Sequence, residues 1–477
     1  MSQNGHTYRR VAVIGAGPSG YAAARALALE KKFDVIRVFE RRDKVGGIWH
    51  FDPLPDEFPL KPASRVTIPP QFPTLAPPAA EDITARTALY EKLDSNVGAE
   101  IMAFSHAPFP LHNSAVSVLR LGHNNASRPF QVVQQYLETL FQEFRQFVSL
   151  STTVERAEKK GDKWILSLRQ PGHAESNGQP RDFWWQENFD AVVVATGHYN
   201  VGAIPNIEGI NETYKKVPVV FEHSKSYRSP DNYVAKKVVV VGGNISAADI
   251  VTDLHAIVKG PLYSAQRGLN EKLIPAWNLP GVVRKPQLKR VFASSDELAN
   301  GQVGVEFSDG EVVTNVDKII FATGFRVAYP FIQPNNPVTS TNRLDGVYEH
   351  IVRIGDPSLA FVGQVKGGLS FRVYEYQAVA IARILAGRAN LPSVAEQKEW
   401  EKKRLSLKGD SVAFHEILPD FGPYWNRLRE IAGKPSPESN SYELPEWQQE
   451  WADTALAILA KKSLWWDEQT QIARAKL

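Results

Sequence analysis

Residues 11–20 read Val-Ala-Val-Ile-Gly-Ala-Gly-Pro-Ser-Gly, and this stretch decides the fold. The four apolar residues predict a buried strand of a parallel sheet, and the alanine-rich residues 21–28 predict the helix that follows it. Between them, Gly15 allows a tight turn and Gly17 lets a pyrophosphate approach the backbone. Gly20 lets the helix pack closely on the strand. The stretch therefore predicts a dinucleotide-binding turn.

An acidic residue stands where this turn needs one. Residues 35–39 predict the second strand, and Glu40 ends it about 20 residues after the last glycine, where a carboxylate can accept from ribose hydroxyls. The N-terminus of the helix that follows the turn offers free N–H groups and a partial positive charge to phosphates. The fingerprint alone does not choose between FAD and NAD.

A second pattern of the same kind begins with four valines at 238–241 and continues as a helix to about residue 258. Its turn reads Gly242-Gly243-Asn244-Ile245-Ser246-Ala247. Asn244 replaces the middle glycine, and Asn tolerates left-handed backbone better than most residues. A strand ending in Ala-Thr-Gly follows each pattern, at 195–197 and at 322–324. Two dinucleotide sites are therefore predicted.

The second site carries a basic residue where the first carries an acid. The next strand is predicted at 261–265, and Arg267 follows it. A guanidinium there could pair with a 2′-phosphate through two hydrogen bonds, which favours NADPH over NADH. A solvated surface arginine is the alternative.

Composition excludes several classes of protein. The 477 residues suggest two or three domains, and 55 basic against 52 acidic side chains give no reason to expect a nucleic acid or an anionic membrane as partner. The chain has no cysteine, which excludes disulfides, thiolate metal sites and a redox-active dithiol. The 11 histidines show no ligand spacing, so no metal site is expected. Without a signal peptide or a membrane-spanning run, a cytoplasmic protein is expected.

The remaining elements are read from periodicity and breakers. The proline-rich residues 53–78 predict an irregular surface segment, and residues 131–147 predict an amphipathic helix. Three short runs predict an antiparallel excursion with a polar turn at 170–181; they are 154–156, 164–168 and 183–185. From Gly363 on the chain is predicted to be helical, with the last helix packed against the body.

The order of the motifs resembles the flavin-containing monooxygenases, a family of class B flavoprotein monooxygenases, and the proline-rich segment resembles an insertion of fungal members. The resemblance covers residues 10 to about 390. It rests on Gly46-Gly47-Ile48-Trp49, Tyr90-Glu91-Lys92-Leu93-Asp94-Ser95-Asn96, Gly242 to Asp249, Ala322-Thr323-Gly324-Phe325 and Glu375-Tyr376-Gln377-Ala378. His223 and Tyr227 match the second half of the family's identifying sequence, but Val217 and Val219 replace its Phe and Gly.

The resemblance implies an α/β fold with two dinucleotide-binding, Rossmann-like domains built on parallel sheets, the NADPH domain being inserted into the FAD domain. The expected bounds are 1–200 and 326–477 for the two parts of the FAD domain, and 201–325 for the inserted domain. It also implies an NADPH- and O2-dependent enzyme. Such an enzyme forms a C4a-hydroperoxyflavin and transfers one oxygen atom to a nitrogen or sulfur of a small molecule, such as an alkaloid-like specialised metabolite.

The site residues follow from the same motifs. Asn96 is the expected catalytic residue, a neutral hydrogen-bond donor near flavin N5, although an Asn before Val97-Gly98 could merely form a turn. The expected FAD residues are Gly15, Gly17, Pro18, Ser19, Gly20, Glu40, Arg41, Gly47, Trp49, Ser95 and Val154. The expected NADPH residues are Gly242, Gly243, Asn244, Ser246 and Arg267. His223 and Tyr227 act either in chemistry or, as the resemblance favours, in structure.

Three rival functions stay open. One is an NADPH-dependent flavin reductase, which the Asn96 block disfavours. Another is a Baeyer–Villiger monooxygenase that acts on ketones. The identifying sequence of that enzyme type ends in Trp-Pro, and this chain lacks that ending. The third is a flavin-binding scaffold without activity, to which Asn244 and Val219 point. The sequence identifies neither the substrate nor the oligomeric state.

Overall fold

The first sheet is mixed and is built around the strand that precedes the glycine turn; its strand β20 (Val352–Arg353), next to one edge, pairs antiparallel with both neighbours. The computed structural model describes residues 8–59, 66–80, 82, 84–176, 178–293, 303–369 and 371–475. The sheet has seven strands in the order β19-β20-β21-β8-β1-β2-β4. They are β1 (Arg10–Ile14), β2 (Val35–Phe39), β4 (Val148–Ser149), β8 (Ala191–Val194), β19 (Val347–Tyr348), β20 (Val352–Arg353) and β21 (Asp356–Phe361). β1 pairs parallel with β2 and β8, and β21 pairs parallel with β8.

Alternate residues of β1 face two different layers, as the period of a strand requires. Val11 and Val13 belong to a core shared with the helices α1 (Pro18–Glu30), α4 (Phe130–Phe141), α8 (Phe371–Leu385) and α10 (Phe421–Ala432). Ala12 and Ile14 belong to a core on the opposite face. Because both faces are covered, β1 is apolar throughout, which is why four consecutive apolar residues predicted it.

The opposite face is covered by an antiparallel sheet of order β3-β7-β6-β5. It consists of β3 (Thr74–Ala76), β5 (Thr153–Lys160), β6 (Lys163–Ser176) and β7 (Gln179–Phe189). The predicted polar turn at 170–181 is therefore wrong for most of its length, because a register shift between Gln170 and Ala174 accommodates Pro171 and Gly172 within the hairpin. The proline-rich segment is also not wholly irregular, since β3 pairs with β7.

The second sheet has five parallel strands in the order β10-β17-β11-β12-β13. They are β10 (Phe221–His223), β11 (Val238–Val241), β12 (Leu262–Ala265), β13 (Val282–Lys285) and β17 (Lys318–Phe321). One face packs on α6 (Ile245–Leu254) and α7 (Ile274–Trp277). The other packs on α5 (Ile210–Lys216) and the antiparallel strands β14 (Leu288–Phe292), β15 (Val303–Phe307) and β16 (Val312–Val316).

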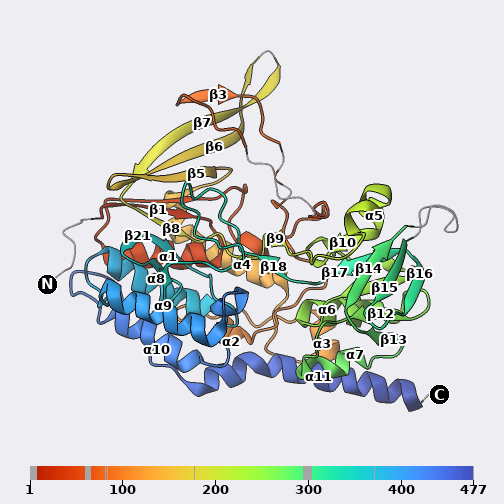
Figure 1. The fold of residues 1–477 in the computed structure, drawn as a ribbon. Helices are drawn as coiled ribbons and strands as arrows, with labels where there is room; N and C mark the ends of the chain where they lie inside the picture. Colours follow the sequence, from red (N-terminus) through yellow and green to blue (C-terminus); the bar gives the residue numbers. More distant parts are fainter. Residues whose placement is uncertain are drawn as a thin grey trace.

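The second sheet is inserted into the first, as predicted, because all its strands lie between β8 and β19 in the sequence. The two connections pair with each other as the antiparallel strands β9 (Val201–Gly202) and β18 (Phe325–Arg326). The fold is thus α/β with two dinucleotide-binding domains (Figure 1). The exact bounds at residues 200 and 325 stay predictions.

The last helix, α11 (Gln449–Ala475), runs along both domains at the lower edge of Figure 1. Ala452 and Ala455 join the core of the first domain, and Trp466 joins that of the second. The short helices α2 (Ala99–Met102) and α3 (Ala115–Leu121) contact it, and α9 (Val394–Lys408) packs near β19. In the described part of the chain, no helix has the length and hydropathy needed to cross a bilayer.

Candidate functional site

A cavity of about 1510 Å³ opens at the carboxyl ends of β1, β2 and β8. Most of the residues predicted for FAD line it, namely Gly15, Gly17, Pro18, Ser19, Glu40, Arg41, Gly47, Trp49 and Val154. Gly20 and Ser95 are not among its lining residues. The carboxyl ends of the strands are where open parallel sheets bind ligands. The structure therefore brings together, around one cavity, residues that are far apart in the sequence.

The glycine turn has the geometry that the sequence required. Gly15 has φ +105°, and a side-chain carbon added there would lie 2.7 Å from the Ala195 carbonyl oxygen. A carbon on Gly20 would lie 1.9 Å from the Gly15 carbonyl oxygen, so helix and turn touch through backbone. At Gly17 the nearest atom would be 3.4 Å away, on Gly47. Gly17 thus has room beside it on the side of the cavity.

The start of α1 leaves backbone donors free for a ligand. Its N-cap residue, Gly17, has no side chain to accept from the first turn, so the N–H groups of the first turn have no capping partner. Such a helix start favours a phosphate. This fits the pyrophosphate of a dinucleotide.

Glu40 supports the glycine turn from the next strand. It is buried, and its two carboxylate oxygens accept from the backbone N–H groups of Ala16 at 2.8 Å and Arg42 at 2.9 Å. Burial lowers the pKa of the neighbouring Arg42 to about 10, which leaves it cationic at neutral pH. Glu40 therefore fixes the turn and lines the cavity with an anionic acceptor.

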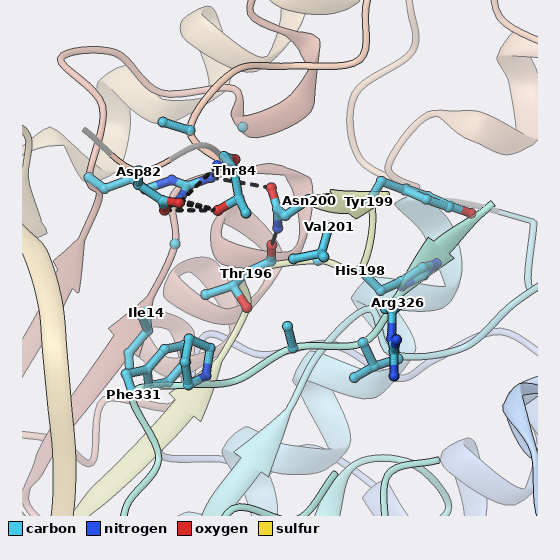
Figure 2. A pocket seen from close by; sticks show the side chains of 18 of the residues that line it. Ile14, Asp82, Thr84, Thr196, His198, Tyr199, Asn200, Val201, Arg326 and Phe331 are labelled. Carbon is cyan, nitrogen blue, oxygen red and sulfur yellow. Dashed lines mark hydrogen bonds and ion pairs between the residues drawn. The ribbon is translucent and has the colours of Figure 1, made fainter. Parts of the chain in front are cut away.

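Arg41 fixes the cavity-lining segment that contains Asp82 and Thr84. Its guanidinium donates to the Asp82 carboxylate and to the Thr84 carbonyl oxygen, both at 2.7 Å. Asn200 donates to the Thr196 carbonyl oxygen at 2.9 Å, and Figure 2 shows it between Thr196 and the Asp82–Thr84 pair. Arg41 also donates to the Asn200 side-chain oxygen at 3.4 Å, so Asp82 and Thr84 are linked through Arg41 and Asn200 to the residues that follow β8.

His198 lines the same cavity and was missed by the sequence analysis. Its Nδ1 lies 2.9 Å from the Gly363 carbonyl oxygen, and burial lowers the pKa of its imidazole to about 4. The ring is therefore neutral, Nδ1 carries the proton, and Nε2 is a buried acceptor with no partner among the described residues. The only available signal was its position after the Ala-Thr-Gly strand end.

The second glycine turn lies between β11 and α6. Gly242 has φ +141°, and a side-chain carbon there would lie 2.4 Å from the Ala322 carbonyl oxygen. Asn244 is not left-handed, as its presence had suggested, but has φ −120°; it caps α6, and its side chain accepts from the Ile245 N–H at 2.9 Å. Asparagine is thus selected here as a capping residue.

Three of the five residues predicted for NADPH are exposed to solvent. Asn244, Ser246 and Arg267 are exposed, whereas Gly242 and Gly243 are half-buried. The residue directly after β12 is Gln266, which is buried and donates to Ser264 at 2.9 Å. Arg267 comes next and is free to reach a phosphate over the edge of the sheet. A role for these residues in NADPH binding stays a prediction.

Asn96 lies where the two domains meet rather than in the wall of the cavity. Its side-chain oxygen accepts from the Lys462 ammonium of α11 at 2.5 Å. The same ammonium donates to Asp249 of α6 at 2.8 Å, and Asp249 also accepts from the Tyr90 hydroxyl at 3.3 Å. Its neighbour Ser95 is buried and accepts from the Arg128 N–H at 3.0 Å.

His223 and Tyr227 make contacts that link segments. His223 accepts at Nδ1 from the Lys225 N–H, and its Nε2 lies 2.9 Å from the Gly324 carbonyl oxygen. Burial lowers the pKa of His223 to about 4, so the ring is neutral at neutral pH. The Tyr227 hydroxyl donates to Asp253 at 3.2 Å. Within the described residues, no three His, Cys, Asp or Glu side chains are grouped so as to hold a metal ion.

Comparison with known proteins agrees with this geometry. The chain matches the flavin-binding monooxygenase-like family over residues 79–270 and 291–436, and an NAD(P)-binding Rossmann-like domain over residues 13–75. It is 29% identical to flavin-containing monooxygenase iboF of Amanita muscaria, covering 86% of this chain and 85% of that protein. It is 30% identical to flavin-containing monooxygenase FMO GS-OX5 of Arabidopsis thaliana, covering 91% and 87%.

A solved structure extends the similarity to the whole fold. The S-allyl-L-cysteine S-oxygenase from Allium sativum superimposes with a TM-score of 0.72 at 26% identity, covering 98% of this chain and 99% of that one. Two Rossmann-like sheets, a cavity at the first glycine turn and a family match over most of the chain lead to one conclusion. This protein belongs to the flavin-containing monooxygenase family and is an FAD-dependent enzyme that uses NADPH.

Proposed function

We propose that this enzyme transfers one oxygen atom from O2 to a nucleophilic nitrogen of a small organic molecule, with sulfur as the next acceptor. FAD, when bound, supplies the redox chemistry, since it takes a hydride from NADPH and then activates O2. The chain supplies binding, orientation and the exclusion of water. The observation that carries the proposal is Asn96, a neutral amide held where the cavity-bearing domain meets the NADPH domain.

The residues around the cavity support FAD as the resident cofactor. The free N–H groups at the start of α1 would hold the pyrophosphate, and Glu40 would accept from ribose hydroxyls. Gly47 and Trp49 come from the short helix η1 (Gly47–Trp49), which lies against Gly17 and so borders the same pyrophosphate region. The buried acceptor of His198 is a further candidate for a hydrogen bond to the cofactor.

The residues of the second turn support NADPH binding on the inserted domain. Gly242, Gly243, Asn244 and Ser246 form the start of α6, and Arg267 would pair with the 2′-phosphate. Asn96 would donate its amide N–H near flavin N5. A neutral donor can stabilise developing negative charge there without itself supplying a proton.

No strong acid or base of the protein is needed for this reaction. His198 and His223 are neutral, and both ring nitrogens of His223 form hydrogen bonds with backbone groups. A heteroatom with a lone pair, an amine nitrogen or a sulfide, would itself act as the nucleophile. The S-oxygenase from Allium sativum, similar in fold and sequence, favours sulfur as the second acceptor.

The test is a panel of amines, sulfides and ketones incubated with purified enzyme, FAD, NADPH and ¹⁸O2. We expect N-oxides or N-hydroxylamines carrying one ¹⁸O, formed at a rate matched by NADPH consumption. If sulfoxides are the only labelled products, sulfur and not nitrogen is the acceptor atom. Esters from ketones would show a Baeyer–Villiger enzyme, and NADPH consumption with no labelled product from any substrate would contradict oxygen transfer. The cytoplasmic location also stays a prediction, checked by cell fractionation.

A further inference from the structure

A lysine lies on the buried face of α11, where an apolar residue is expected. Ala455, Ile458, Lys462 and Trp466 recur at the three- and four-residue spacing of one helix face. Ala455, Ile458 and Trp466 are each 1% exposed, and the Lys462 side chain is 13% exposed. Lysine is rarely buried without a polar partner, so the position of Lys462 on this face requires partners for its ammonium.

Lys462 has two partners, and they come from different domains. It donates to the side-chain oxygen of Asn96 in the first domain and to Asp249 of α6 in the second. The helix is anchored on both sides of it. Gly98 contacts the helix so closely that a side-chain carbon there would lie 2.6 Å from the Thr454 carbonyl oxygen, and Thr470 donates to the Asn278 carbonyl oxygen at 3.2 Å.

The amide of Asn96 has two chemically different ends, and Lys462 distinguishes them. An ammonium has only donors, so the end that faces it must be the oxygen. The NH2 end is thereby turned away from the Lys462 ammonium, and it has no hydrogen-bond partner within the part of the chain that the structure describes. Without Lys462, the amide could rotate and present its oxygen instead, which would repel developing negative charge.

We propose that Lys462 is a positioning residue for the oxygen-transfer reaction. It holds the Asn96 amide with its donor end toward the cofactors, and it links this orientation to α6, the helix that follows the NADPH turn. This inference rests on the proposed function, because it requires that Asn96 donates near the flavin. Among the described residues, the hydrogen bonds of Lys462 go to Asn96 and Asp249, neither of which lines the cavity or belongs to the second glycine turn.

The test compares Asn96→Ala, Lys462→Met, the double variant and Lys462→Arg, with the exposed Lys461→Met as control. Three quantities are measured on FAD-loaded enzyme: H2O2 released per NADPH consumed, the NADP+ dissociation constant, and the flavin absorption spectrum. We expect Lys462→Met to increase H2O2 release by about tenfold, as misplacing a catalytic donor does. It should also reproduce the spectral change of Asn96→Ala.

The double variant decides whether Lys462 acts through Asn96. We expect it to be no worse than Asn96→Ala alone, Lys462→Arg to restore most of the coupling, and Lys461→Met to behave as the unchanged protein. Unchanged H2O2 release in Asn96→Ala would overturn the role of Asn96 and the inference together. If Asn96→Ala increases H2O2 release and Lys462→Met does not, the inference alone is overturned. The same holds if the increases caused by the two single substitutions multiply in the double variant. If Lys462→Met does not retain FAD, Lys462→Gln takes its place in the same comparison.

Discussion

Gly17 and Gly20 have different roles in the first glycine turn, and the contacts around each residue separate those roles. A side-chain carbon added to Gly20 would lie 1.9 Å from the Gly15 carbonyl oxygen, whereas one added to Gly17 would meet nothing nearer than 3.4 Å. The sequence assigned both to one fingerprint. Which of them is needed to fold, and which to bind, depends on the distances around each one.

We therefore expect Gly20→Ala to impair folding and Gly17→Ala to impair FAD binding. Gly20→Ala forces the start of α1 off the sheet, so we expect little folded protein. Gly17→Ala should fold with a thermal midpoint close to that of the unchanged apoprotein, yet bind FAD at least about tenfold more weakly, since the methyl group blocks approach of the pyrophosphate. Circular dichroism and FAD titration check this. Tight FAD binding by Gly17→Ala would contradict the assignment.

Buried neutral histidines should make the fold sensitive to acid. Burial lowers the pKa of His198 and His223 to about 4 and that of His415 to about 3, from an ordinary 6.5. Below pH 6.5 the unfolded chain binds more protons at these sites than the native one, so stability falls as pH falls. Each site costs up to about 2 kcal/mol by pH 5.

Glu349 works in the opposite direction, because burial raises its pKa to about 7 and its native form takes up a proton first. Burial also raises the pKa of Asp56, Asp94, Glu222 and Glu401, and it also lowers the pKa of His106 and His350. Because the ordinary histidine pKa of 6.5 lies between pH 5 and pH 7 and the ordinary carboxyl pKa lies below pH 5, we expect a net loss of stability over this range. Urea unfolding at pH 7 and pH 5 measures it, and we expect a lower midpoint at pH 5. A midpoint that is unchanged or higher would show that these histidines are not neutral in the native protein.

Sequence reasoning found the residues of the first turn because strand, glycines and acid lie within 40 residues and follow a fixed spacing. It missed Lys462, which lies 366 residues from Asn96 and follows no motif. The prediction that Asn244 adopts a left-handed backbone was wrong, because Asn244 caps α6 with an extended backbone. Helix caps and left-handed positions both favour asparagine, so the sequence alone does not distinguish them. Contacts between distant segments were beyond its reach.

At the scale of elements, α11 is one of the elements that pack on both domains. Its first half packs in the core of the first domain and Trp466 packs in that of the second. The sequence predicted a helix packed on the body, but not that one helix would span both domains. Likewise, β3 was hidden because its short run lies among prolines, and only pairing with β7 makes it a strand.

Replacing Trp466 by Ala should loosen the second domain from α11. Removing a fully buried tryptophan leaves a cavity that costs about 3–5 kcal/mol. Leu464, on the exposed side and 69% exposed, is the matched control, and Leu464→Ala should change stability by less than about 0.5 kcal/mol. Urea unfolding followed by tryptophan fluorescence checks both. Equal effects of the two substitutions would mean that α11 does not pack as described.

At the scale of the whole molecule, contacts from several segments join the inserted domain to the FAD domain, among them the hydrogen bonds of Arg228 to Asp52 and Thr87. The connections pair as β9 and β18, and Lys462 links Asn96 to Asp249. The repeated strand–turn–helix pattern and the Ala-Thr-Gly strand ends were enough to predict this architecture. They could not give the relative placement of the domains, which depends on packing between segments that share no pattern.

The most direct measurement of the central claim is stopped-flow absorbance. The enzyme is reduced by NADPH without oxygen and then mixed with O2 in the absence of substrate. We predict a blue-shifted absorbing species that persists while NADP+ stays bound, with little H2O2 released, because the proposed role of Asn96 supplies a neutral donor near the flavin. Immediate return to oxidised flavin with one H2O2 per flavin, unchanged when amine or sulfide is added, would contradict the account.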